Sequence, residues 1–456
     1  MMPTSVSETA ATSKYLAILR SLVTWTALGL FIAGGFVAGA LGMFRFLNLS
    51  QDTLPVALIS SGLSFGAKPQ SDGAPDWRNK ERVNILVLGG DRRSDEPSDQ
   101  PIRTDTIMLV TIDPTSRSAG MLSIPRDLLI PIPLPSKDCS YLPWGNPYGQ
   151  ERINTAFVYG ELCGYPTGGA GLTKDTVQYN FGVKVHYYAL IDFDAFEQFI
   201  DAIGGVEIEV PERLVDNEYP TPDYGIMSIE IPAGRQHLDG EKALWYVRSR
   251  HMDSDFGRMH RQQQFLLALR EQVLRLGMLP RLPQLALDFR DMAQTDLSPL
   301  EIASLLLLVK DIDAEYITNR TLEFPYVTSL TGPDGGSYLL PMRERIRELI
   351  TKFLADPRLR EEGATVEVLN GAGVSGLAAR TADRLKERGI TEVITGNTDD
   401  GKARRVTEIH DLTGKGYTAA VIAGILGVPK DRITSLAAGE QDPDIRVVLG
   451  EDLRDR

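Results

Sequence analysis

Short apolar runs alternate with amphipathic stretches through the middle of the chain. Residues 83–89 (Val-Asn-Ile-Leu-Val-Leu-Gly) form an apolar run that ends in glycine, which is typical of a strand buried on both faces. Similar runs predict strands at residues 106–112, 119–124 and 187–191. An amphipathic helix is predicted at residues 194–203, capped by Gly204-Gly205, and residues 206–210 alternate as a strand does. Strands mixed with helices predict an α/β layered domain.

Three more helices are predicted to complete this domain, at residues 258–276, 299–309 and 341–354, so that it spans residues 83–355. A polar connection at residues 356–363 leads into a second unit at residues 364–456. Strands are expected there at residues 366–369, 392–394, 407–410 and 445–449, with helices at 375–388 and 418–426. This pattern predicts a small α+β domain.

The amino-terminal region differs in composition. Residues 21–44 contain no ionisable side chain, and such a run is long enough to cross a bilayer core of ~30 Å. Lys14 and Arg20 precede the run, whereas Arg45 alone follows it before Asp52. This bias predicts a cytoplasmic tail at residues 1–20 and places the chain after about residue 45 outside the cytoplasm.

A cleaved signal peptide is the alternative. Its apolar region would be only about 7–15 residues long and would end in small residues, unlike Met43-Phe44-Arg45-Phe46. We therefore predict one transmembrane helix at residues 21–44. Residues 45–82, which include a tract rich in Ser, Gly and Pro, are predicted to form a stalk.

Arginines gather in a few segments of a chain whose formal net charge is −13, so they are not general solubilising charge. A guanidinium group stays protonated, and its planar fork fits pairs of phosphate oxygens. Asp91 follows the first strand and Asp105 begins the second; both are suitable ligands for a divalent cation held against the same phosphates. The pattern predicts a site for pyrophosphate.

The segments expected to converge on this anion are distant in the sequence. Arg93 follows the first strand, and Arg126 follows the third. Arg248 and Arg250 stand two apart on a run, residues 244–247, that is predicted to be extended, so their side chains would share one face. On the next helix, Arg258 and Gln262 are four apart and Arg261 lies beside them. A solvated helix face explains Arg261 alone, but not why the whole turn is basic.

Together these residues resemble the LytR-CpsA-Psr family of cell-envelope proteins. The matching motifs are Gly-x-Asp-x-Arg at 89–93, Arg-Thr-Asp-Thr at 103–106, Ser-Ile-Pro-Arg-Asp at 123–127, Arg-Ile-Asn-Thr-Ala-Phe at 152–157, Ile-Gly-Gly-Val at 203–206, Tyr-Val-Arg-Ser-Arg-His at 246–251, Asp-Phe-Gly-Arg at 255–258 and Arg-Gln-Gln at 261–263. The resemblance covers roughly residues 83–354. It implies an α/β/α domain, with a mixed central sheet flanked by helices, behind one membrane anchor.

The resemblance also implies an activity: a membrane-anchored extracytoplasmic phosphotransferase that moves a glycopolymer, such as a teichoic acid, from a polyprenyl-pyrophosphate carrier onto peptidoglycan. The pyrophosphate would be bound by Arg93, Arg126, Arg248, Arg250 and Arg258, with Gln262 assisting. Asp91 and Asp105 would hold Mg²⁺ or Mn²⁺, and Asp91 is also a candidate base. Membrane lipid is an expected partner, whereas nucleic acid is not, given the acidic charge and outward topology.

Two alternatives use the same residues. One is a non-catalytic binder of polyprenyl pyrophosphate, acting as an envelope regulator or scaffold. The other is a lipid pyrophosphatase that delivers water in place of a glycan hydroxyl. The near-complete set of arginines and aspartates favours the transferase, because a scaffold does not need both metal and phosphate ligands.

The two cysteines, Cys139 and Cys163, are compatible with a disulfide bond outside the cytoplasm, and also with two unrelated buried thiols. A metal site is not expected, because no further sulfur or histidine ligands cluster nearby. Of the two remaining alternatives we favour the disulfide bond.

In the second unit, Gly371, Gly373 and Gly376 fit the Gly-x-Gly-x-x-Gly fingerprint of dinucleotide sites. The unit is too short for a doubly wound domain, so a tight strand-to-helix turn is predicted and no nucleotide cofactor is expected. Residues 366–453 instead resemble the LytR carboxy-terminal domain.

Overall fold

The structure is a computed structural model. It describes residues 82–91, 102–133, 150–221, 223, 225–250, 254–275, 293–332, 335–399, 402–439 and 442–454. The predicted transmembrane helix and stalk lie outside these residues. Among the helices that are described, none combines the length and the apolar character needed to cross a membrane.

A mixed six-stranded sheet with the order β11-β6-β1-β2-β3-β12 organises the first domain. Its strands are β1 Val83–Gly90, β2 Thr104–Asp113, β3 Ser118–Ser123, β6 Tyr187–Ile191, β11 Ala293–Thr295 and β12 Ile317–Thr321. β2 is antiparallel to β1 and β3, β11 is antiparallel to β6, and β6 and β12 run parallel to β1 and β3. The expected mixed central sheet is confirmed.

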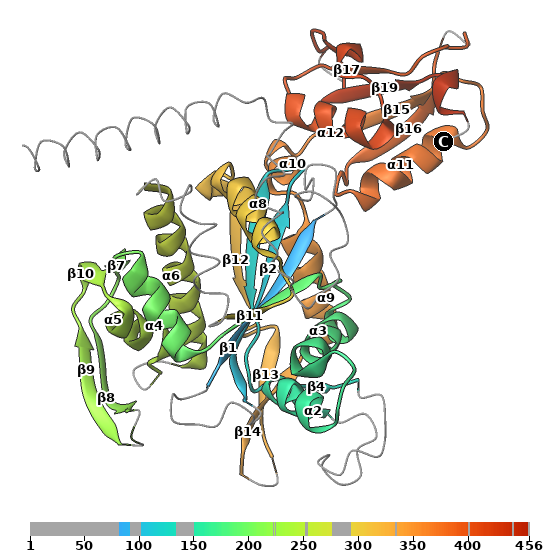
Figure 1. The fold of residues 1–456 in the computed structure, drawn as a ribbon. Coiled ribbons are helices and arrows are strands. Elements are labelled where there is room, and N and C mark those ends of the chain that lie inside the picture. Colours follow the sequence, from blue (N-terminus) through green and yellow to red (C-terminus); the bar gives the residue numbers. More distant parts are fainter. Residues whose placement is uncertain are drawn as a thin grey trace, which may run out of the picture. The chain divides into compact units, whose positions relative to one another are not determined.

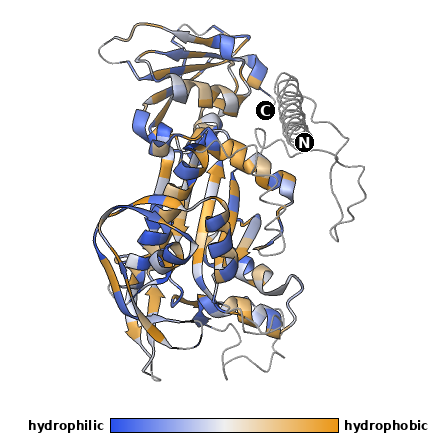
Figure 2. Ribbon diagram, turned by 60° about the vertical axis from the view of Figure 1, so that its left-hand side comes forward, coloured by the Kyte–Doolittle hydropathy of each residue, from blue (hydrophilic) through white to orange (hydrophobic). Residues whose placement is uncertain are grey.

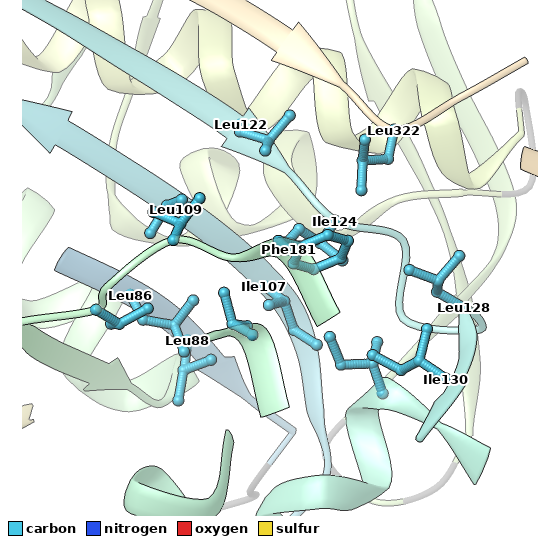
Figure 3. Close-up of a cluster of buried hydrophobic side chains, with 14 of the residues drawn as sticks. Leu86, Leu88, Ile107, Leu109, Leu122, Ile124, Leu128, Ile130, Phe181 and Leu322 are labelled. Carbon is cyan, nitrogen blue, oxygen red and sulfur yellow. The ribbon is translucent and has the colours of Figure 1, made fainter. Parts of the chain in front are cut away.

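One face of this sheet carries the largest apolar core (Figure 3). Leu86 and Leu88, two apart on β1, point to the same face and are fully buried, as is Leu109 of β2. They belong to one cluster with Phe181 of helix α3 (Gly168–Phe181) and Phe353 of helix α9 (Arg343–Leu354). Burial of such side chains stabilises the fold by roughly 1.5–3 kcal/mol each, so this face contributes a large part of the stability of the domain.

The opposite face is covered by two separate groups of helices (Figure 1). Helix α8 (Pro299–Lys310) packs Leu305 against Val83 and Ile112 at one end of the strands. Helices α4 (Phe193–Ala202), α5 (Gly240–Arg248) and α6 (Asp255–Arg275) share a second cluster with β7 (Val206–Val210) and β10 (Gly234–Leu238). Val87 and Met108, which are paired across β1 and β2, line a pocket together with side chains of these three helices.

Shorter elements surround the layers. They are the hairpins β8 Leu214–Pro220 with β9 Ile226–Ile231 and β13 Val327–Thr331 with β14 Ser337–Pro341, the pair β4 Leu129–Pro131 with β5 Gln150–Arg152, helix α2 Ala156–Leu162, and 3-10 turns at Ile153–Thr155 and Ala314–Tyr316.

The carboxy-terminal unit has its own core. Its five-stranded sheet has the order β16-β15-β19-β17-β18, built from β15 Val366–Asn370, β16 Val393–Asn397, β17 Glu408–Asp411, β18 Ile433–Ser435 and β19 Ile445–Leu449. Helices α11 (Leu377–Glu387) and α12 (Gly416–Leu426) pack on it, with 3-10 turns at Lys430–Arg432 and Glu451–Leu453. In both units hydrophobic residues concentrate on the inner strands (Figure 2).

Two predictions of local structure are wrong. The polar connection at residues 356–363 is largely helix α10 (Pro357–Glu362). Asp356 caps its start, Pro357 fits its first turn, and Leu359 is buried in the core of the carboxy-terminal unit. The predicted extended run at residues 244–247 lies within helix α5. Its amino terminus is capped by Asp239, which accepts a hydrogen bond from the Lys242 amide at 2.9 Å.

The glycines of the dinucleotide-like motif have structural reasons. Gly373 and Gly376 have φ angles of +67° and +73°, and a Cβ at Gly371 would lie 2.8 Å from the Leu449 carbonyl oxygen. They therefore form the tight strand-to-helix turn that was predicted.

Candidate functional site

Asp91 and Asp105 are brought together by an irregularity between β1 and β2. Gly89 pairs with Thr106, but Gly90 pairs with Thr104, so Asp105 is the extra residue of a β-bulge. A bulge re-aims the side chain that it carries. The Asp91 amide donates to the Arg103 carbonyl at 3.1 Å, which holds Asp91 beside this bulge. Gly89 is required here, because a Cβ would lie 2.8 Å from that of Thr106.

The carboxylate of Asp105 is held by two side chains from distant segments. Arg126, in the turn after β3, donates to Oδ2, and the Asn154 amide donates to Oδ1 at 3.0 Å. Burial by itself raises the pKa of Asp105, but attraction from Arg126, the Asn154 hydrogen bond and attraction from Arg258 outweigh it, so the pKa lies below its ordinary value. Asp105 is therefore a fixed negative charge.

Arg258 joins the bulge to helix α6. It is 5% exposed, donates to the Asp105 carbonyl at 3.0 Å and pairs with Asp255 at 2.7 Å. Burial raises the pKa of Asp255 above its ordinary value, although Arg258 and Arg126 oppose this effect. Arg126 also lies 3.9 Å from Asp255. Two arginines and two aspartates thus form one linked group, and each charge fixes the position of its neighbours.

Arg248 ends helix α5 instead of lying on a strand. Its guanidinium lies 4.3 Å from the centroid of the Phe193 ring and 5.5 Å from that of Tyr219, and Nη2 is 3.6 Å from Asp91 Oδ1. Gln262 of α6 donates to Thr106 Oγ1 at 2.9 Å and to the Val247 carbonyl at 3.1 Å. These contacts connect the end of α5 with the bulge of β2.

A single pocket of about 180 Å³ contains most of the predicted ligands. Its polar lining includes Asp91, Asp105, Arg248, Arg250, Arg258 and Gln262. Apolar side chains from the sheet and from helices α4 to α6 line the rest, among them Val87, Met108, Phe196, Leu244, Phe265 and Leu266. A charged end joined to an apolar interior suits an amphiphile with a phosphate head and a hydrocarbon tail.

The two aspartates also fit a divalent cation of the Mg²⁺ type. Such ions are usually bound by one or two carboxylates together with substrate phosphates, and Asp91 and Asp105 line the same pocket. Within the described part of the chain, no group of three or more His, Cys, Asp or Glu side chains is placed to hold a metal. The phosphates of a ligand would have to complete the coordination.

Two predicted residues lie outside the described residues: Arg93 and Cys139. Cys163 is disulfide-bonded. Asp216 and Ser249 also line the pocket, although they were not predicted as site residues. Asp216 could have been found from the strand pattern, because it lies two positions after Leu214 and therefore on the same, buried face of β8.

The LytR_cpsA_psr family model matches residues 62–353, and a second model, described as LytR cell envelope-related transcriptional attenuator, matches residues 363–453. The regulatory protein MsrR of Staphylococcus aureus is 31% identical over 223 residues, which are 48% of this chain and 58% of MsrR. The chain thus matches little more than half the length of that relative.

Two further relatives are named as enzymes. The polyisoprenyl-teichoic acid–peptidoglycan teichoic acid transferase TagU of Oceanobacillus iheyensis is 30% identical over 57% of this chain and 74% of its own length. TagV of Bacillus subtilis, of the same name, is 26% identical over 74% of this chain and 79% of its own length. The crystal structure of TagV aligns with a TM-score of 0.47 and 26% identity over 60% of this chain and 98% of the crystallised chain. Because the first family model covers well over half of its residues, the chain belongs to the LytR-CpsA-Psr family.

Proposed function

We propose that this protein transfers a glycopolymer from a polyprenyl-pyrophosphate carrier to peptidoglycan outside the cytoplasm, forming a phosphodiester and releasing polyprenyl phosphate. The pocket carries the proposal, because one continuous surface joins arginine side chains to an apolar interior. The names of TagU and TagV support teichoic acid and peptidoglycan as the classes of donor and acceptor.

In the proposed reaction, a hydroxyl oxygen of the acceptor glycan attacks the phosphorus next to the donor sugar. A new P–O bond forms, and the P–O bond to the polyprenyl phosphate breaks. The leaving group carries away the bonding electron pair, and the hydroxyl proton passes to Asp91, whose side chain is 44% exposed. Positioning and charge neutralisation supply most of the acceleration in phosphoryl transfer.

The arginines supply that neutralisation. Arg248 and Arg258 are held in place by aromatic and ionic contacts before any ligand binds, so little reorganisation is needed during the reaction. Mg²⁺ or Mn²⁺ held by Asp91 and Asp105 would add positive charge at the phosphates. The hydrocarbon tail of the carrier would occupy the apolar part of the pocket.

The test uses the full-length chain in detergent, with magnesium, a polyprenyl-pyrophosphate glycan and peptidoglycan oligomers. Mass spectrometry measures the phosphodiester-linked product for the wild type, Arg248→Ala and Asp105→Ala. Arg347→Ala is the control, because Arg347 is 72% exposed. We expect both site variants to lose at least about a hundredfold in rate, and the control to lose little.

Other outcomes would contradict the proposal. Lipid binding without product or phosphate release would indicate a scaffold. Phosphate release without a linked product would indicate a pyrophosphatase.

A further inference from the structure

The segment that ends helix α5 carries two of the proposed pyrophosphate ligands, Arg248 and Arg250. The last carbonyl groups of a helix have no partner within the helix, and this end is not closed by a left-handed glycine, since Ser249 has a φ of −53° and a ψ of 142°. What fixes this segment therefore decides where both guanidinium groups point.

Helix α6 supplies the missing donors for the carbonyls. Arg261 donates from Nε to the Tyr246 carbonyl at 2.9 Å and from Nη2 to the Ser249 carbonyl. The neighbouring Gln262 donates to the Val247 carbonyl. Arg261 is not among the residues that line the pocket, so its guanidinium acts on the backbone of the segment.

Hairpin β8–β9 also contacts the same segment. Asp216 and Ser249 are 1% and 2% exposed, and the Ser249 hydroxyl donates to Asp216 Oδ2 at 2.8 Å. The second oxygen of Asp216 accepts from the Glu218 amide at 3.0 Å, which fixes the carboxylate. Removing either partner of such a buried hydrogen bond leaves a polar group unsatisfied, which is costly.

We propose that Arg261 and Asp216 are positioning residues, which clamp Val247 to Arg250 between α6 and β8 so that Arg248 and Arg250 meet the pyrophosphate group together. The proposal rests on the proposed function, because it takes these two arginines as pyrophosphate ligands. It assigns Arg261 a specific task that a solvated helix face does not have.

Arg270 offers a matched control for Arg261. It lies on the same helix and also donates to two backbone carbonyls, those of Val309 in the last turn of α8 and of Ile312 just after that helix, and none of these three residues lines the pocket. Arg261→Lys and Arg270→Lys therefore remove equivalent backbone contacts and differ in whether the affected segment reaches the ligand.

The experiment measures calorimetric affinities of the full-length chain in detergent for farnesyl pyrophosphate and farnesyl monophosphate. We expect Arg261→Lys to lower the preference for pyrophosphate by about tenfold or more, because small displacements of aligned groups are costly. Arg270→Lys should keep the wild-type preference, even if both variants melt at similar, lower temperatures. Equal preferences in the two variants would overturn the proposal.

A double-mutant cycle tests the second half of the clamp and does not depend on the folding of the arginine variants. Ser249→Ala and Asp216→Ala should each weaken pyrophosphate binding, and the double variant should be no weaker than the worse single variant. Additive losses would show that the two side chains act independently. If the wild type binds pyrophosphate but forms no linked product, the proposed function fails while the clamp is still tested by these affinities.

Discussion

Asp105 and Asp255 lie in the same group of charges, yet their pKa values shift in opposite directions. The pKa of Asp105 is lowered because Arg126 and the Asn154 side chain donate hydrogen bonds directly to its carboxylate. The pKa of Asp255 is raised because the effect of burial outweighs that of its ion pair with Arg258. The difference arises from the number and direction of donors, which neighbouring residues in the sequence do not specify.

These shifts predict opposite pH dependences of stability. The contribution of Asp105 should be complete above the pKa of an unfolded aspartate, about 3.9, and be lost as pH falls through its lower folded pKa. The difference in unfolding free energy between wild type and Asp105→Asn should therefore shrink below about pH 4. For Asp255→Asn, the wild type should gain stability relative to the variant as pH falls. Urea unfolding from pH 7 to 2.5 measures both, and parallel slopes would contradict the assignment.

Replacing Arg258 by lysine tests whether the shape of the guanidinium group is needed in addition to its positive charge. Arg258 Nη2 contacts both the Asp105 carbonyl and the Asp255 carboxylate, whereas lysine keeps the charge but carries it on a compact ammonium group in place of the planar guanidinium. We expect Arg258→Lys to reduce kcat/KM at least about a hundredfold and to lower the unfolding free energy by roughly 3 kcal/mol. Arg347→Lys, in an exposed pair with Glu344, should change stability by less than about 0.5 kcal/mol. Product assays and chemical unfolding test the pair, and equal effects would be inconsistent with this role.

At the scale of elements, the turn from α4 to β7 determines how strand β7 packs against helices α4 to α6. Gly204 and Gly205 have φ angles of +82° and +81°, and the Gly205 amide donates to the Ile200 carbonyl at 2.9 Å. The predicted helix cap is therefore confirmed. Two consecutive left-handed residues reverse the chain so that β7 can pair with β10.

Gly205→Ala should consequently be destabilising. A Cβ would lie 2.6 Å from His237 and 2.8 Å from the Leu238 carbonyl oxygen, in addition to a backbone cost of about 1–2 kcal/mol. Gly424→Ala is the opposite control, because that glycine lies within α12 with open space around it and alanine should stabilise by roughly 0.5–1 kcal/mol. Urea midpoints that move in the same direction would refute this account.

At the scale of the whole molecule, the core of the carboxy-terminal unit includes residues that precede the predicted domain boundary at residue 364. Leu359 of α10 is 6% exposed within that core. The Tyr417 hydroxyl donates to Asp356 at 2.5 Å, and the Thr418 amide donates to Glu362 at 2.7 Å. Helix α10 is thus an integral part of the carboxy-terminal unit.

A fragment of residues 356–456 should therefore be more stable than one of residues 364–456. Burial of Leu359 alone predicts a difference of about 2 kcal/mol, before the hydrogen bonds are considered. Urea unfolding followed by circular dichroism measures both fragments. Identical midpoints would show that α10 adds nothing to this unit.

The sequence alone determined the elements whose pattern is local. The strands β1, β2 and β3 follow from apolar runs, and the ordered motifs identify the family. The state of residues 244–247 depended on tertiary structure, because a short apolar run fits either a strand or a buried helix, and packing of α5 against α4 and α6, together with the Asp239 cap, selects the helix. The same is true of the pocket and of the partners of Arg126, Arg258 and Arg261. Those contacts join residues far apart in the chain, so only the folded arrangement of sheet and helices fixes them.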